Sequence, residues 1–345
     1  MTRFAGFGSN RVRAVALVAD QGPAVGLIVL IAATWTVFGV INGSFLSSFN
    51  LFGIGQLAAR DAVLGMAQAA LVVMGRMNLA LGSVGAICVS LLGYMLVSAH
   101  IALPLTLLAV AAAGMLASVI MGVVELKTGL SSFIVTLAFL SAYGGGALLV
   151  SRGDNFQITT PALSSLGSGT FLSAAVCPLV VVALICGGIT WVIYNRTSFG
   201  WKSLAIGANE RAARASGVNA GRVLLGAYAL SGLLAAVAAV MESSYELSVN
   251  ANVGSDWLLP SFVAVVLGGV TLTGGDITIA GILLAAVFFD SLQSGLTILN
   301  VSSYWLNLAE GLVLLAAVVI DQLRRNRRGR ERRSRAVVAV EVTRV

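Results

Sequence analysis

Long apolar runs, each about as long as a bilayer is thick, follow one another along almost the entire chain. A helix needs about 20 mostly apolar residues to cross the hydrocarbon core. Because 58% of the 345 residues are hydrophobic and only 10% are charged, a soluble fold could not bury this surface. We therefore predict an all-α polytopic transmembrane bundle of about 10 spans, some broken or re-entrant. The runs place these spans near 23–41, 57–75, 81–98, 101–124, 131–150, 174–194, 223–241, 258–271, 277–297 and 304–321.

The basic residues gather on one side of this predicted bundle. When the spans are counted in order, all of the 21 lysines and arginines except Arg60 and Arg152 fall on the side of the N-terminus. Because cytoplasmic loops carry an excess of Lys and Arg, both termini are predicted to be cytoplasmic. The chain then divides into a cytoplasmic segment (1–22), a transmembrane domain (23–321) and a basic cytoplasmic tail (322–345). We expect the tail to meet anionic membrane lipid and not nucleic acid.

Few side chains offer catalytic or metal-binding chemistry. His100 is the single histidine, which excludes a multi-histidine metal site or a histidine-based triad. Neither Lys127 nor Lys202 follows a glycine, so the chain lacks a phosphate-binding Gly-Lys-Ser/Thr loop. Three cysteines lie in apolar runs without CxxC spacing, namely Cys88, Cys177 and Cys186. We predict no catalytic residue, metal or cofactor in this chain, so any ATP-driven role requires a separate ATPase.

Glycine-rich segments interrupt two of the apolar runs, at Gly75–Gly82 and at Leu267–Asp276. Irregular backbone at membrane depth is tolerated only where protein or a water-filled cavity satisfies its polar groups. Close helix packing through glycine is an equally good explanation. Cavity lining and packing therefore both remain open, and the two segments are candidates for equivalent parts of an internal repeat.

The longest internal cytoplasmic loop, 195–222, contains the signals of a short helix. Asn209 can cap a helix that begins at the acidic Glu210, and Gly217 in a left-handed conformation would end it. Such a helix can dock in the groove of a partner, or it can be a surface helix without a partner. It would present Glu210, Arg211, Ala212, Ala213 and Arg214.

This loop carries a family resemblance. The stretch Phe199–Asn219 resembles the coupling loop of ribose-type sugar ABC permeases, whose pattern is FG-x-x-x-x-A-x-G-x-N-x-x-A-A-x-x-S-G-(I/V)-N. Four further stretches resemble the same family in the same order: Gly82-Ser83, Phe133–Leu137, Val265–Gly269 with Gly274-Gly275, and Val301–Trp305.

The resemblance implies a transport subunit of the bacterial cytoplasmic (inner) membrane. Such a permease pairs with a second permease copy, as a homodimer or a related heterodimer, and binds two cytoplasmic ABC ATPase subunits, which hold ATP and Mg. A periplasmic or lipid-anchored binding protein delivers the sugar. The resemblance also implies which residues couple the permease to the ATPase, namely Gly207, Asn209, Glu210, Arg211, Ala212, Ala213, Ser216 and Gly217.

The candidate substrate pathway consists of Asn78, Ser83, Phe133, Gly268, Gly269, Asp290 and Tyr304. Two departures from the family pattern bear on the substrate, because an acid is replaced by Asn78 and two acids are missing from Trp257–Pro260. A ribose- or xylose-like sugar, a related polyol and a nucleoside-like solute all remain open as substrates.

An ion-coupled secondary transporter is the main alternative mechanism. Such a transporter would need buried acids as ion relays, and it would have no use for a docking loop.

Several polar residues lie within or near the predicted spans. Glu242, Tyr245, Glu246 and Asp256 are predicted on the outer side, where they could meet the binding protein, line the entrance or form a solvated loop. Asp290 lies inside a span, where a charge is costly and usually faces a cavity or a partner. An interface role and a pathway role are both open for Asp290.

Overall fold

A computed structural model describes residues 22–169 and 177–302, together with parts of 304–319. The predicted segment before residue 22 and the basic tail 322–345 lie outside the described residues. The helices are α2 (Gly22–Ile41), η1 (Gly43–Leu46), α3 (Ser48–Val72), α4 (Leu81–Gly93), η2 (Tyr94–Ser98), α5 (Leu103–Thr128), α6 (Ser132–Ser151), α7 (Pro161–Ser168), α8 (Pro178–Arg196), α9 (Ser198–Ala208), α10 (Glu210–Ala215), α11 (Ala220–Glu246), α12 (Leu258–Leu267) and α13 (Ile279–Ile298). The strands are β1 (Phe156–Gln157) and β2 (Ser248–Val249).

The described residues confirm a helical polytopic membrane protein. Seven of their helices are long and apolar enough to cross a bilayer, namely α2, α4 with its π-helical extension η2, α5, α6, α8, α11 and α13. The shorter α12 occupies most of the predicted span 258–271. Only part of the predicted last span, 304–321, is described.

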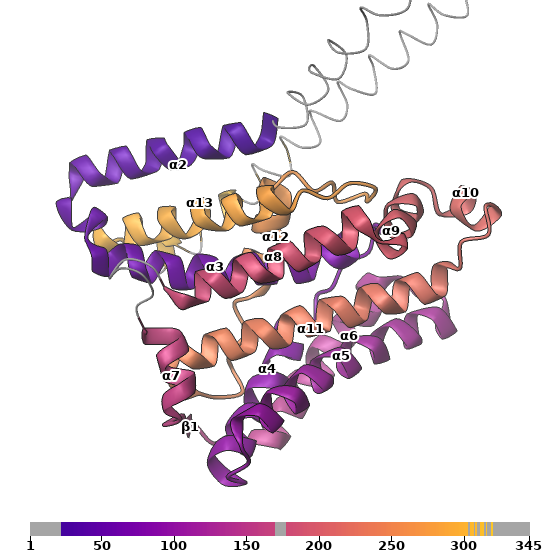
Figure 1. The fold of residues 1–345 in the computed structure, drawn as a ribbon, viewed down its shortest axis with the longest axis horizontal. Helices are drawn as coiled ribbons and strands as arrows, with labels where there is room; N and C mark the ends of the chain where they lie inside the picture. Colours follow the sequence, from indigo (N-terminus) through magenta and orange to yellow (C-terminus); the bar gives the residue numbers. More distant parts are fainter. Residues whose placement is uncertain are drawn as a thin grey trace, which may run out of the picture.

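The long helices lie roughly side by side, and α11 packs against α5, α3 and α4 (Figure 1). Helices α9 and α10 lie together at one end of the bundle, whereas α7 and β1 lie at the other (Figure 1). At that second end β1 pairs with β2 in an antiparallel register that places Phe156 opposite Val249. Neither α7 nor β1 was expected in the predicted loop 151–173, because both are too short to give a periodic signal.

The first predicted helix interruption is present as a non-helical stretch between α3 and α4, which we call the α3–α4 segment (73–80). Three of its backbone polar groups are hydrogen bonded to side chains of neighbouring helices. Gln68 of α3, with its amide oriented to match its neighbours, donates to the Asn78 carbonyl oxygen (3.0 Å) and accepts from the Asn78 amide (3.3 Å). The Met77 amide donates to Ser132 Oγ of α6 (3.2 Å). Protein therefore satisfies this irregular backbone.

The second interruption, the α12–α13 segment (268–278), contacts the first. The Gly275 amide donates a hydrogen bond to the Val73 carbonyl oxygen at 2.8 Å, and a Cβ on Gly75 would lie 3.1 Å from the Thr273 carbonyl oxygen. Two segments that are about 200 residues apart in sequence thus meet at one place, at the end of the bundle that carries α9.

A second close contact lies deeper in the bundle, where α4 crosses the loop that leads into α12. A Cβ on Gly82 would collide with the Gly254 carbonyl oxygen, and a Cβ on Gly254 would collide with the Gly82 carbonyl oxygen. Gly254 also has a φ of 92°, which side-chain-bearing residues rarely adopt. Close packing through glycine is therefore one use of the glycine-rich pattern.

Arg60 falls within the predicted span 57–75 and is one of the two basic residues counted on the side opposite the N-terminus; the structure shows that it is buried. Arg60 lies inside α3 and is 7% exposed. Its guanidinium pairs with Asp61 Oδ1 (2.7 Å) and with Glu242 Oε2 of α11 (2.9 Å). Glu242 is also buried, and it accepts a hydrogen bond from Trp257 Nε1 (3.1 Å). A buried charge is tolerated because partners compensate it, so Glu242 is not part of a solvated loop.

Candidate functional site

The predicted short helix is present as α10, with the predicted ends. Asn209 Oδ1 accepts a hydrogen bond from the Ala212 amide at 3.0 Å, which is the geometry of an N-cap. At the other end Gly217 has a φ of 83°, and the Val218 amide donates to the Ala213 carbonyl oxygen at 3.1 Å. Local signals in the sequence therefore fix where this helix begins and ends.

The exposed face of α10 differs from the expectation at one residue. Ala213 is only 6% exposed and packs in the core of this chain, together with Ala220 at the start of α11. A helix in contact with the bundle must turn one face inward, and Ala213 lies on that face. Ala212 is exposed and is the small residue available to a partner. The other exposed residues between 209 and 217 are Asn209, Arg211, Arg214, Ala215, Ser216 and Gly217.

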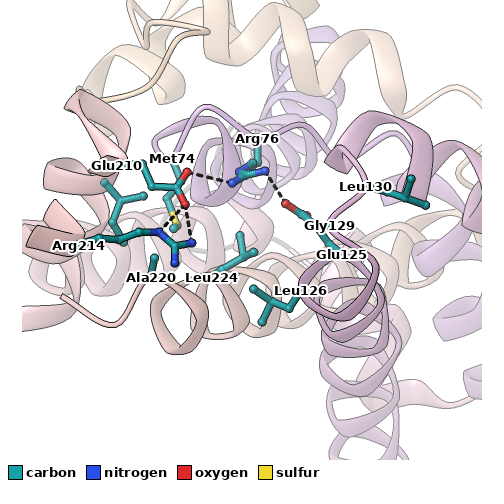
Figure 2. A pocket seen from close by; sticks show the side chains of 11 residues that line it. Met74, Arg76, Glu125, Leu126, Gly129, Leu130, Glu210, Arg214, Ala220 and Leu224 are labelled. Carbon is teal, nitrogen blue, oxygen red and sulfur yellow. Dashed lines mark hydrogen bonds and ion pairs between the residues drawn. The ribbon is translucent and has the colours of Figure 1, made fainter. Parts of the chain in front are cut away.

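An ion-pair network joins α10 to the rest of the bundle. Arg76 of the α3–α4 segment bridges two acids, with Nη1 2.7 Å from Glu125 Oε1 of α5 and Nη2 3.1 Å from Glu210 Oε2 of α10 (Figure 2). Glu210 also pairs with Arg214 one turn later, at 2.7 Å. Glu125 accepts a further hydrogen bond from the Tyr228 hydroxyl of α11 at 2.7 Å.

These charges surround a cavity of about 160 Å³ between α5, α10 and the start of α11 (Figure 2). Apolar side chains, among them Leu126 and Leu224, complete its wall. The pKa of Glu210 lies below its usual 4.5, first because Arg214 hydrogen bonds to the carboxylate and also because Arg76 is close. Since a lowered pKa keeps the carboxylate ionised, these ion pairs are complete above the usual value and are lost only as the pH falls through the lowered pKa.

Helix α9 rests directly on the two irregular segments. A Cβ on Gly207 would collide with the Val73 carbonyl oxygen and would lie 2.5 Å from the Gly275 amide nitrogen. Gly207 is therefore placed where the α3–α4 and α12–α13 segments are hydrogen bonded to each other. Only a residue without a side chain allows this approach.

Two of the predicted pathway residues lie along the α3–α4 segment and α4. Asn78 is fully buried, and its Nδ2 lies 3.4 Å from Ser231 Oγ of α11. Ser83 lines a cavity of about 360 Å³ between α4, α6 and the residues before α12, and it donates to the Leu140 carbonyl oxygen at 2.8 Å. Leu79 and Gly254 line the same cavity.

The other predicted pathway residues lie elsewhere. Gly268 packs against Gly281 of α13, and Gly269 adopts a φ of 84° in the following turn. Phe133 and Tyr304 are 51% and 87% exposed. Asp290 is buried in α13, close to Asp61 of α3. The seven residues therefore do not surround one cavity.

Sequence reasoning did not bring together the residues of the two charge clusters, one around Arg60 and one around Arg76. Glu210 and Glu242 were named, but Arg76 was only counted among the basic residues on the N-terminal side, and Glu125 and Asp61 were not singled out. One signal was available, because Glu125 stands in the last turn of α5, where the helix dipole disfavours an acid and an acid calls for a cationic partner. The identity of that partner, Arg76, depends on tertiary structure.

The bundle, its broken helices and the capped surface helix define a membrane transport subunit. The permease family described as "Branched-chain amino acid transport system / permease component" matches residues 61–318. The chain belongs to this family of ABC-transporter permeases, and within it to the ribose-type group. It is accordingly a multi-pass protein of the inner membrane and a transport component.

Several characterised permeases are similar to the chain over most of its length. The ribose import permease protein RbsC of Bacillus subtilis (strain 168) is 30% identical over 303 residues, covering 87% of this chain and 92% of the relative. RbsC of Escherichia coli (strain K12) is 29% identical over 310 residues, covering 88% and 93%. The autoinducer 2 import system permease protein LsrD of Yersinia enterocolitica is 30% identical over 305 residues, covering 86% and 90%. No solved structure matches the chain.

Proposed function

We propose that the chain is the membrane-spanning permease of an ABC importer for a small sugar, either a ribose- or xylose-like monosaccharide or a related polyol. A periplasmic or lipid-anchored binding protein delivers the sugar to a pair of permeases. Separate cytoplasmic ATPase subunits, holding ATP and Mg, drive the cycle. The similarity to RbsC over 87% of the chain carries this proposal.

In this proposal α10 is the element that docks on the ATPase. Its N-cap and left-handed end give it a defined shape, and Arg211 and Ala212 are exposed on it. A short helix with small and charged side chains fits a groove on a partner, and the small side chain allows close approach. Ala213 supports α10 from beneath, because it is buried.

A tryptophan at Ala212 tests this docking. In proteoliposomes that contain the permease, its ATPase and its binding protein, Ala212→Trp is expected to abolish ATPase binding and sugar uptake because the indole prevents close approach. Ala112→Trp, on an exposed position of α5 away from both ends, is the control and should retain both activities. Full uptake by Ala212→Trp would show that α10 is not the docking element.

A ligand screen on the binding protein would identify the sugar.

The orientation of the bundle is a further prediction. Lys202 and Ser168 are both exposed, and the helices that carry them, α9 and α7, lie at opposite ends of the bundle (Figure 1). Single cysteines at these positions, in a variant without Cys88, Cys177 and Cys186, should differ in labelling by a membrane-impermeant thiol reagent. Ser168→Cys should react in intact cells and Lys202→Cys only after lysis. The reverse pattern would place α9 and α10 outside.

A further inference from the structure

We propose that the α3–α4 segment (73–80) carries the movement of α9 and α10 into the membrane domain, and that Arg76 is the positioning residue of this transmission. The inference rests on the proposed function, in which α10 docks on the ATPase. In this mechanism the α3–α4 segment receives the movement through α9 and α10, and the ATPase docks on α10.

The first contact between the docking region and this segment is made by backbone. Gly207 of α9 lies against the Val73 carbonyl oxygen, and the same oxygen accepts the hydrogen bond from the Gly275 amide (2.8 Å). Backbone atoms in contact cannot rotate aside as a long side chain can. A displacement of α9 must therefore displace the α3–α4 segment and the α12–α13 segment together.

The second contact is the side chain of Arg76, which holds Glu210 of α10 and Glu125 of α5 at the same time. Each acid has another partner, because Glu210 also pairs with Arg214 and Glu125 also accepts from Tyr228. Arg76 can thus release either acid without leaving a carboxylate wholly uncompensated. The Arg76–Glu210 pair is partly exposed, whereas Glu125 is buried. An exposed ion pair contributes little to stability, so the pair with Glu210 is suited to being made and broken during a cycle.

The same segment continues from this end to the middle of the bundle. Two residues after Arg76, Asn78 reaches Ser231 of α11, and its Oδ1 accepts from the Ala80 amide (3.1 Å) at the start of α4. One turn into α4, Ser83 lines the 360 Å³ cavity. The segment therefore forms one covalent path from the α10 network to this cavity, and it is non-helical, so it can change its dihedral angles more easily than a helix.

Substitution of Arg76 separates transmission from docking. Arg76→Gln is expected to bind the ATPase with unchanged affinity and to keep its basal ATP hydrolysis. Its stimulation of hydrolysis by the sugar-loaded binding protein should fall by roughly 2- to 30-fold, the range of side chains that carry coupling between sites. Arg76→Lys keeps the charge and should recover part of the stimulation. Lys127→Gln, which removes an exposed cation at the same end, should behave as the unmodified protein.

The outcomes distinguish this inference from the proposed function. If Arg76→Gln keeps full stimulation while Ala212→Trp loses docking, the importer assignment stands and the transmission role of Arg76 is wrong. If Arg76→Gln loses ATPase binding itself, Arg76 only supports the docking surface, which also overturns the inference. If Ala212→Trp binds the ATPase and transports normally, α10 is not the docking element. The transmission role of Arg76, which depends on that docking, is then wrong as well.

A second measurement uses the unmodified protein, so it does not require a variant that folds. In the complex of unmodified permease, ATPase and binding protein in lipid nanodiscs, hydrogen exchange is followed by mass spectrometry with and without a non-hydrolysable ATP analogue. Peptides that cover 73–80 should change their exchange rate on nucleotide binding, whereas peptides from the middle of α5 should not. Unchanged exchange in 73–80, in a complex that binds the analogue, would refute the transmission role.

Discussion

Arg60→Met is expected to lower the free energy of unfolding by about 3–5 kcal/mol, because it removes one partner of a buried ion-pair cluster and leaves the other charges uncompensated. Asp61 and Glu242 lie 2.7 and 2.9 Å from the guanidinium, and all three side chains are less than 10% exposed. Methionine fills a similar volume but offers no donor. The thermal midpoint in detergent and the amount of folded protein in the membrane should both fall.

Two companion variants identify the cause. Arg152→Met removes an exposed arginine at the end of α6 and should leave the midpoint almost unchanged. Arg60→Met combined with Glu242→Gln removes one of the uncompensated charges and should recover part of the loss. An Arg60→Met protein with the midpoint of the unmodified chain would mean that the cluster contributes nothing to stability.

Gly82→Val should cost about 3 kcal/mol, at the upper end of the range for overpacking a core. The new Cβ would meet the Gly254 carbonyl oxygen, which is a backbone atom and cannot rotate aside as the end of a side chain can. The crossing of α4 with the residues before α12 would have to open. Chemical denaturation in detergent micelles measures the loss, and sugar uptake should decline in parallel because this crossing borders the cavity lined by Ser83.

The same substitution at Gly145 is the control. Gly145 lies in α6, and a Cβ there has no other atom within 4 Å. Gly145→Val should therefore retain stability and uptake. Equal stability of the two variants would show that the crossing of Gly82 and Gly254 opens at no cost in free energy.

Features with a local physical cause could be predicted from the sequence. The length of the apolar runs predicted the helical membrane bundle, and the glycine-rich interruption at Gly75–Gly82 predicted the break between α3 and α4. The cap at Asn209 and the left-handed Gly217 were predicted because side-chain capping and positive φ depend on a few neighbouring residues.

Features that depend on distant contacts could not be predicted. Arg60 and Glu242 are 182 residues apart, and Arg76 and Glu210 are 134 residues apart, so no pattern in one sequence pairs them. The face of α10 was assigned incorrectly at Ala213 for the same reason. Cap signals fix the ends of a helix, but its rotation about the axis depends on what it packs against.

The buried position of Arg60 also has a consequence for how the protein is made. Helix α3 enters the membrane long before α11, and translation at about 5–20 residues per second adds the 182 residues up to Glu242 in roughly 10–35 s. During this interval Arg60 has Asp61 beside it, but its carboxylate on α11 has not yet been synthesised. An arginine at membrane depth is costly without its partners, so α3 is expected to stay at the insertion machinery, or near its protein wall, until α11 arrives. Membrane integration of this chain would then end with a late, concerted release of α3 and α11 into lipid, and not with the independent exit of each helix.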